Sequence, residues 1–423
     1  MSKNIGFIST RFAGTDGVTL EASKWAQVFR QMGHQCFWFA GELDKNPDRS
    51  FLTPEAFFHH EKNQWINERI LGKTARSSEV TDAILSMKTF LKVRIKEFIE
   101  KFSIDLLVPQ NALTIPMHVP LGIAITEIIA ETQIPTIAHH HDFYWERTRF
   151  SVNAVGDYTR MAFPPNLTNM EHVVINSAAQ EELALRTGIA STIIPNILDF
   201  ENPPPVDSER TIKLRRNIGL APDDIVILQP TRIVQRKGIE HAIELVKDLK
   251  DPRCKLIISH ESGDEGYEYA EWLKEDAKDQ GVDLRLFSIR MRDPWNELKA
   301  AESEYTLLDV YPCADFVTYP SLYEGFGNAF LEAVYFKNPM LINRYATFVR
   351  DIEPKGFDLI AMDGFLTAKN VQQVKDVLFS SERKQQMVDH NYKLATRYYS
   401  YSVLRRWLNN LLTNFFGMEA QFQ

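Results

Sequence analysis

The sequence contains few cysteines and no long apolar run. Its three cysteines, Cys36, Cys254 and Cys313, are widely separated among 423 residues and form no CxxC pair, which argues against a zinc knuckle or a disulfide framework. We interpret Cys36 and Cys313 as buried thiols of a protein from a reducing compartment. No stretch reaches about 18 apolar residues, so no membrane-spanning helix is predicted. The first residues, MSKNIGFISTRF, become charged too early for a signal peptide, and we expect a cytoplasmic protein.

An excess of positive charge is also lacking. The chain has 48 lysines and arginines against 56 aspartates and glutamates, a formal net charge of −8. Because a phosphate backbone needs a basic surface, we expect no nucleic-acid partner. Any anionic ligand must then be held by a few placed cations and backbone amides. The composition is otherwise globular, with 44% hydrophobic and 25% charged residues, and the length suits two large domains.

The usual glycine fingerprints of nucleotide sites are missing as well. A turn that includes Gly14 and Gly17 follows the first apolar segment, but it is neither GxGxxG nor a P-loop, which argues against dinucleotide and NTPase sites. The turn could bring backbone amides to a phosphate or a sugar, and a plain turn remains the alternative.

Three consecutive histidines, His139 to His141, end another apolar segment. Neighbouring side chains of a strand point to opposite faces, so these three cannot easily share one ion. We expect no metal, with one histidine facing a ligand and the others packing in the core.

Short apolar segments alternate with helical patterns along the chain. Because such alternation forms parallel sheets covered on both faces, the sequence predicts an α/β protein with two doubly wound halves that face each other across a cleft. Prolines 203–205 interrupt the pattern and mark a linker within 196–210. We place the domains at 1–200 and 201–395, and a helix at 396–423. Strands are predicted at 5–9, 35–40, 105–109, 135–138, 172–175, 225–229, 255–259, 284–287, 316–319 and 340–343.

The segment from Thr318 to Glu332 carries one candidate site. A strand ends at Tyr319, and a loop with Glu324, Gly325, Phe326 and Gly327 leads into a helix for which Asn328 is the expected N-cap. A helix start offers unpaired N–H groups to a phosphate, and carboxylates accept sugar hydroxyls. A capped core helix with an incidental glutamate is the alternative.

A second candidate lies between Gln229 and Ile239, where a strand again runs through a loop into a helix. Arg232 and Lys237 stand in this loop, and two cations beside a helix start suit a diphosphate. Solvated loop cations are the alternative, and Arg236 is expected to be exposed.

Two further stretches keep alternative interpretations open. Residues 44–80 are rich in aromatic residues and histidines, and they are either an excursion that contacts the acceptor or packing. A stripe of Lys88, Lys92 and Lys96 on a helix at 84–102 suits a weak contact with an anionic membrane surface, but a solvated helix face is favoured.

Together these residues resemble glycosyltransferase family 4, the retaining group 1 glycosyltransferases. Glu324 to Glu332 resembles the E-x7-E segment of that family, and Arg232 with Lys237 resembles its R-x4-K motif. The linker sequence Ile194-Pro195-Asn196 and the glycine turn also resemble the family. The resemblance implies a GT-B fold of two Rossmann-like domains, a nucleotide-sugar donor bound mainly by the C-terminal domain, no metal cofactor, and a last helix that crosses back to the N-terminal domain.

The resemblance also implies roles for single residues. By position, Glu324 contacts hydroxyls of the donor sugar and Glu332 contacts the ribose, while Arg232 and Lys237 hold the diphosphate. Gly17 presents its amide to the donor phosphate, Gly14 belongs to the same donor-binding turn, and His141 faces the transferred sugar. The remaining donor-binding residues are Gly325, Phe326, Gly327 and Asn328. The loop after residue 258 departs from the family, because Ser259-His-Glu-Ser-Gly263 replaces a glycine-rich turn, and this leaves the nucleotide base open.

The function implied is transfer of a hexosyl group from a UDP- or GDP-sugar to a hydroxyl of a glycan, lipid or small molecule, with retention of the anomeric configuration. A sugar phosphorylase, a nucleotide-sugar epimerase and a non-catalytic nucleotide-sugar-binding protein are the alternatives. The sequence does not indicate the sugar, the acceptor or the oligomeric state.

Overall fold

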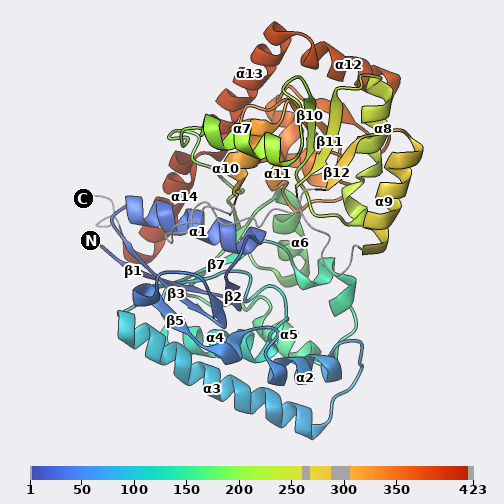
Figure 1. Ribbon diagram of the computed structural model, residues 1–423. Coiled ribbons are helices and arrows are strands. Elements are labelled where there is room, and N and C mark those ends of the chain that lie inside the picture. The colour runs from blue at the N-terminus through green and yellow to red at the C-terminus, as the bar shows by residue number, and fades with distance from the viewer. Residues whose placement is uncertain (1, 260–266, 287–304, 418–423) are drawn as a thin grey trace. The chain divides into compact units, whose positions relative to one another are not determined.

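The computed structural model describes residues 2–259, 267–286 and 305–417 (Figure 1). Among them the chain forms two compact units. The first contains the chain up to Pro195 and again from Leu404, and the second extends from Asn196 to Val403. Of the predicted segments, Phe287 and most of the 259–263 loop lie outside the described residues.

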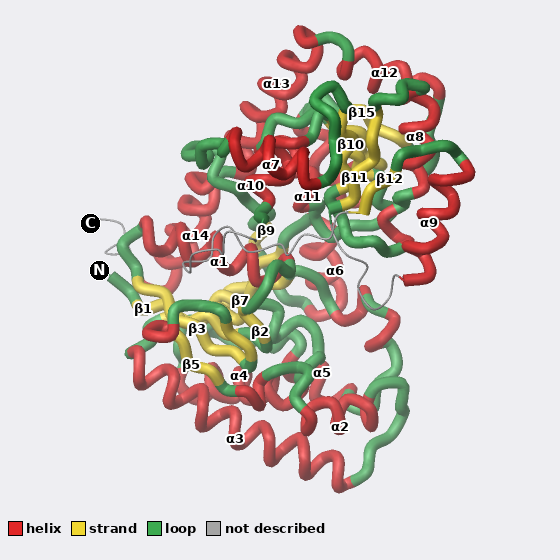
Figure 2. Tube along the Cα trace, viewed as in Figure 1, coloured by secondary structure: helices red, strands yellow, loops and turns green. Residues whose placement is uncertain are grey.

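The first unit is built on a seven-stranded parallel sheet with the order β5-β3-β1-β6-β7-β8-β9. Figure 2 shows its strands in yellow, with β1, β3, β5, β7 and β9 labelled. All five strands predicted in this half are confirmed, since each apolar run became a buried strand. The short edge strands escaped prediction because two or three residues carry no detectable period. The strands are β1 Asn4–Ile8, β3 Gln35–Ala40, β5 Ser50–Leu52, β6 Leu106–Pro109, β7 Thr136–His140, β8 Met170–Val174 and β9 Thr192–Ile193; β2 Arg11–Phe12 pairs separately with β4 Glu42–Leu43.

Helices follow most of these strands. The long helix α3 (Ser78–Phe102) buries a stripe of residues such as Ile84, Leu91 and Phe98, as its period predicts. The others are α1 Gly17–Gln31, α2 Glu61–Ile70, α4 Val119–Thr132, α5 Gly156–Ala162 and α6 Ser177–Thr187. The stretch 44–80 is therefore structured in part as β5 and α2.

The lysine stripe of α3 is paired with two glutamates of the neighbouring helix. Lys88 and Lys92 contact Glu127 of α4, and Lys92 and Lys96 contact Glu131. Since these cations already face carboxylates, they do not offer a free basic surface to an anionic membrane. Within the described ranges, no helix has both the length and the apolarity that crossing a bilayer requires.

The second unit contains a six-stranded parallel sheet with the order β12-β11-β10-β13-β14-β15. The strands are β10 Ile225–Gln229, β11 Cys254–Ile258, β12 Leu284–Leu286, β13 Phe316–Tyr319, β14 Met340–Asn343 and β15 Ile360–Met362. The order matters for function, because β10 and β13 are neighbours although their pairs, Ile227 with Phe316 and Leu228 with Val317, are far apart in sequence. The loops that follow these two strands are therefore adjacent.

The helices of the second unit include the two that the sequence predicts after the candidate loops, which are α8 and α11. The helices described in this unit are α7 Ser208–Asn217, α8 Glu240–Leu249, α9 Tyr267–Asp279, α10 Leu307–Val310, α11 Asn328–Tyr335, α12 Ala368–Leu378 and α13 Ser381–Tyr399. The last helix, α14 (Tyr401–Phe416), belongs to the first unit from Leu404 on, and within that unit Arg405 donates to Gln31 and Asn414 donates to Glu171. All three cysteines are free and buried, which confirms the interpretation of Cys36 and Cys313 as core thiols.

Candidate active site

A buried ion pair joins the two predicted loops of the second unit. Lys237, in the 3₁₀ turn after β10, contacts the carboxylate of Glu324 in the loop after β13. Their side chains are only 9% and 11% exposed, and Arg236 approaches the same carboxylate at 3.5 Å. Two residues that are 87 positions apart in the sequence thus form one charged centre.

The Glu324 carboxylate of this pair is ionised at neutral pH. Burial alone would raise the pKa of Glu324, but the charge and hydrogen bond of Lys237 outweigh burial and lower that pKa. Burial lowers the pKa of Lys237, and the nearby cations Arg236 and Arg232 lower it further against the attraction of Glu324. The centre therefore holds excess positive charge that an added anion would balance.

Close backbone approach brings the two loops together. Gly238 has φ +59°, and a Cβ at this position would lie 2.7 Å from the carbonyl oxygen of Pro320. The amide of Leu322 donates to the carbonyl of Arg236 at 2.9 Å, and the Arg236 guanidinium donates to the carbonyl of Tyr323 at 3.0 Å. The glycine is thus required by the distance between the loops as well as by its backbone angle.

Helix α11 begins next to this centre. The prediction of Asn328 as its N-cap was wrong, because the helix starts at Asn328 and the cap position is Gly327, with φ +115°. A side chain cannot cap from a glycine, and the Asn328 side chain instead accepts from Asn196 at 2.6 Å. In the described part of the chain, the backbone N–H groups of Asn328 and Ala329 have no acceptor. Both are therefore available to an anion.

Replacing Gly327 with alanine is expected to destabilise this turn by more than about 2 kcal/mol. The new Cβ would combine a left-handed backbone with a 2.2 Å approach to the Tyr345 hydroxyl, which itself donates to the carbonyl of Phe326. Chemical denaturation measures the loss. Adding Tyr345→Phe to Gly327→Ala removes the colliding oxygen and should restore part of the stability. No recovery would mean that the clash is not the cause.

The second glutamate of the segment is oriented by a tyrosine that sequence inspection missed. The fully buried Tyr311 donates its hydroxyl to Glu332 at 2.6 Å, and burial raises the pKa of Tyr311 well above its ordinary value. The hydroxyl therefore stays a donor and holds the half-buried carboxylate in one orientation. Nothing in the local sequence around Tyr311 marks this contact.

Arg232 differs from Lys237 in its surroundings. Its side chain is exposed, and among the described residues it forms no ion pair or hydrogen bond. Its charge nevertheless acts on Lys237. The loop after β10 thus presents one buried and one unpaired cation.

In the first unit, the glycine turn leads directly into α1. Asp16 caps this helix by accepting from the amides of Val18 and Thr19. The amide of Gly14 donates to Asp44 at 2.9 Å, whereas that of Gly17, the first residue of α1, has no acceptor within the described ranges. Of these two glycines, Gly17 is the one whose amide N–H can donate a hydrogen bond to a ligand.

His141 lies immediately after β7, and its ring is within electrostatic reach of Asp16 and Lys24 of the α1 region. Its Nε2 contacts Gln110 Oε1 at 3.0 Å, and its amide donates to Asn111 Oδ1 at 3.0 Å. Burial lowers the pKa of His141 to about 4, so the ring is neutral. A neutral imidazole has one donor and one acceptor nitrogen, so it can form a hydrogen bond with a hydroxyl in either direction.

The other two histidines of the run pack in the core. His139 stacks on Trp25 with 4.2 Å between ring centroids, and His140 contacts His172 at 2.9 Å between ring nitrogens. Burial lowers the pKa of His139 and of His140 well below the ordinary value. No group of three or more potential metal ligands is found in the part of the chain that the structure describes.

Acid is expected to destabilise the first unit through His118. Its Nδ1 accepts from the amide of Leu121 at 3.2 Å, and its Nε2 donates to the carbonyl of Glu55 at 2.8 Å, so a second proton would face an N–H group. Burial lowers its pKa from 6.5 to about 4. Stability is therefore intact above pH 6.5 and falls as the pH drops toward 4, by about 3 kcal/mol for this residue.

Urea unfolding at a series of pH values tests this. His118→Asn keeps a capping oxygen but does not titrate, so the variant should lose less stability between pH 6.5 and 4 than the parent protein. Equal pH slopes for the two proteins would refute the assignment.

Comparison with known proteins assigns the family. A sequence profile described as "Glycosyl transferases group 1" matches residues 211–394. The chain is 33% identical over 381 residues to the mannosylglucosylglycerate synthase of Petrotoga mobilis, covering 85% of this chain and 86% of that protein. The chain belongs to the group 1 glycosyltransferases. This transferase is also 31% identical over an alignment of 435 positions to the mannosylglucosylglycerate synthase of Thermotoga maritima, covering 94% of this chain and 96% of the relative.

Solved structures agree with the fold. Anabaena HepE in complex with UDP-glucose matches the glycosyltransferase with a TM-score of 0.64 at 12% sequence identity, covering 97% of this chain and 100% of that chain. The two Rossmann-like parallel sheets are thus those of a GT-B protein, as the sequence predicts.

Proposed function

We propose that this glycosyltransferase transfers a mannosyl group from UDP- or GDP-mannose to a hydroxyl of glucosylglycerate, with retention of the anomeric configuration. The observation that carries the proposal is the match over most of the chain to two mannosylglucosylglycerate synthases, at 33% and 31% identity. A protein of that name joins a mannosyl group to a glucosylglycerate unit.

The second unit supports the donor half of the proposal. Lys237, the unpaired Arg232 and the free amides of Asn328 and Ala329 are three kinds of donor for a diphosphate. The carboxylates of Glu324 and Glu332 can accept sugar and ribose hydroxyls, and Tyr311 fixes the orientation of the latter. No metal is required, because cations and amides of the chain itself meet the charge of the leaving group.

The chemical step follows from this charge distribution. The bond between the sugar C1 and the diphosphate oxygen breaks, and its electron pair leaves with the diphosphate. The acceptor hydroxyl oxygen bonds to C1 on the same face, and its proton passes to the departing diphosphate. Lys237, Arg232 and the amino end of α11 stabilise the developing negative charge. This route needs no nucleophilic side chain on the far face of the sugar.

A panel of UDP-, GDP- and ADP-linked mannose and glucose, offered with glucosylglycerate, tests the proposal. We expect a mannosylated product with one nucleotide-mannose, and NMR of its anomeric carbon should show the donor's configuration. The preferred donor should also raise the melting temperature, because it binds the native state.

Other outcomes identify the alternatives. Inverted configuration would contradict retention. Product formation from mannose 1-phosphate, with no need for a nucleotide, would indicate a phosphorylase. Donor binding without nucleotide release under any condition would indicate a binding protein.

A further inference from the structure

A cavity of about 430 Å³ with both polar and apolar walls lies in the first unit, and neither the glycine turn nor His141 lines it. Small-molecule sites typically enclose about 300–1,000 Å³, so this volume suits a glycoside of a small acid. Its walls come from four segments of the unit. The lining residues are Phe58, His59, Gln64, Asn67, Glu68, Leu71, Met117 and Arg149.

Two lining residues of the cavity belong to segments that follow strands, at the edge of the sheet where parallel α/β sheets bind ligands. Met117 belongs to the segment after β6, and Arg149 belongs to the segment after β7 that begins with His141. The Phe58 wall contacts the guanidinium of Arg11 at 5.4 Å, and Arg11 in turn pairs with Asp16, the cap next to Gly17. Contacts within the first unit thus connect the cavity to the residues that the family resemblance places at the reacting sugar.

An unpaired cation faces this cavity. The exposed guanidinium of Arg149 forms no ion pair or hydrogen bond within the described ranges, and it lies 5.6 Å from the centroid of the Phe150 ring. The carboxylate in the wall, Glu68, already lies 3.6 Å from Arg69. Arg149 is therefore available to an anionic group, which a guanidinium can bind with two parallel hydrogen bonds.

Neutral polar groups complete the wall. Asn67 is 8% exposed, and its amide nitrogen donates to the carbonyl of Met117 at 2.9 Å. His59 and Gln64, which contact each other at 3.2 Å, add further hydrogen-bonding groups. A ligand with hydroxyl groups as well as an anion satisfies such a wall.

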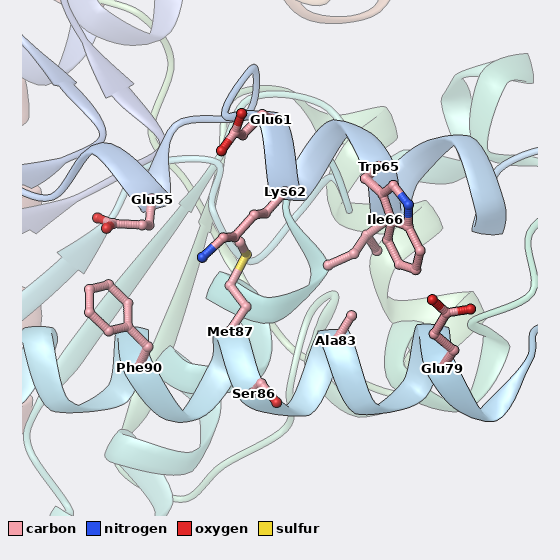
Figure 3. Close-up of a pocket in the computed structure, with 10 residues that line it drawn as sticks. All are labelled: Glu55, Glu61, Lys62, Trp65, Ile66, Glu79, Ala83, Ser86, Met87 and Phe90. Carbon is pink, nitrogen blue, oxygen red and sulfur yellow. The ribbon is translucent and has the colours of Figure 1, made fainter.

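A larger cavity of about 650 Å³ between α2 and α3 has a lining with net negative charge (Figure 3). Three carboxylates, Glu55, Glu61 and Glu79, line it together with a mainly apolar floor, and Figure 3 shows a single cation, Lys62, extending from α2 toward Met87. An acid would be repelled there, so of these two cavities in the described part of the chain the one with Arg149 suits an acid better.

We infer that the cavity containing Arg149 binds the acceptor's acid end, with the guanidinium of Arg149 holding the glycerate carboxylate and the polar wall holding hydroxyls. This inference rests on the proposed function for the identity of the acid. It makes Arg149 a specificity-determining residue that selects a carboxylate-bearing glycoside over a neutral one.

The test compares two acceptors that differ in one group: glucosylglycerate and glucosylglycerol, in which a CH2OH replaces the carboxylate. Arg149→Gln should raise KM for glucosylglycerate at least tenfold, since a hydrogen-bonded charge is lost. It should change KM for glucosylglycerol less than about twofold and leave kcat similar. Arg149→Lys should retain part of the preference for the acid. The control is Arg160→Gln on α5, which removes another exposed arginine that does not line the cavity.

Calorimetric binding of both glycosides to the same variants separates this inference from the proposed function. Binding of glucosylglycerate that depends on Arg149, without transfer, would support the cavity and refute the proposed reaction. If transfer occurs and Arg149→Gln changes KM equally for both acceptors, or for neither, Arg149 does not bind the carboxylate. The proposed reaction would then remain supported. Neither binding nor transfer would refute both.

Discussion

Lys237→Ala should lower kcat/KM for glycosyl transfer by about a hundredfold or more. Lys237 is the buried cation beside the start of α11, and loss of one preorganised donor to a developing negative charge costs about 3 kcal/mol in the barrier. The substitution also leaves the buried carboxylate of Glu324 without its main partner, which should destabilise the protein by about 3–5 kcal/mol. Steady-state kinetics and chemical denaturation measure the two effects.

A double variant separates catalysis from stability. Lys237→Met with Glu324→Gln removes both charges of the buried pair, and replacing both members of such a pair is often neutral for stability. We expect the melting temperature to recover toward that of the parent protein while transfer stays lost. Recovery of transfer together with stability would show that Lys237 acts on the fold alone.

Arg232→Ala should lower kcat by about a hundredfold with almost no effect on stability. Its exposed side chain has no ion pair or hydrogen bond to other described residues, so its removal breaks no contact that supports the fold. Its charge, however, would stabilise the leaving diphosphate in the transition state. Transfer kinetics at saturating donor, with thermal unfolding in parallel, provide the measurement.

The matched control is Arg216→Ala in the last turn of α7, which removes another exposed arginine of the second unit. It should leave both activity and stability near the parent values. Equal turnover in the Arg232 and Arg216 variants would remove Arg232 from the diphosphate site.

Local sequence predicted the strands and helices well, for a physical reason. The strands β3, β10, β13 and β14 begin and end where their apolar runs do, because a strand buried on both faces of a parallel sheet must be apolar along its length. Helix α3 was visible through its repeated buried face. The short strands β5 and β15 were missed, since only pairing with a neighbouring strand makes three residues a strand.

Motif spacing also identified the residues that form the charged centre of the second unit. Arg232, Lys237, Glu324 and Glu332 were all named from sequence, and the structure brings Lys237 and Glu324 into contact. The local prediction at Asn328 failed because Gly327 is the cap residue. Gly327 has a left-handed backbone and lies close to the hydroxyl of Tyr345. Cap preference is a property of a few residues, whereas the close approach at Gly327 involves Tyr345, 18 positions further along the chain.

The sequence by itself thus determined the alternation of strands and helices, the family and the chemical types at the site, because each is encoded within a few turns of chain. Tertiary structure alone decided which of those groups meet. The placement of β10 beside β13 brought Lys237 to Glu324, and the fold brought the distant Tyr311 to Glu332 and left Arg149 unpaired over a cavity. These contacts join residues from separate segments, so they depend on the order of strands in the sheet, which no local pattern records.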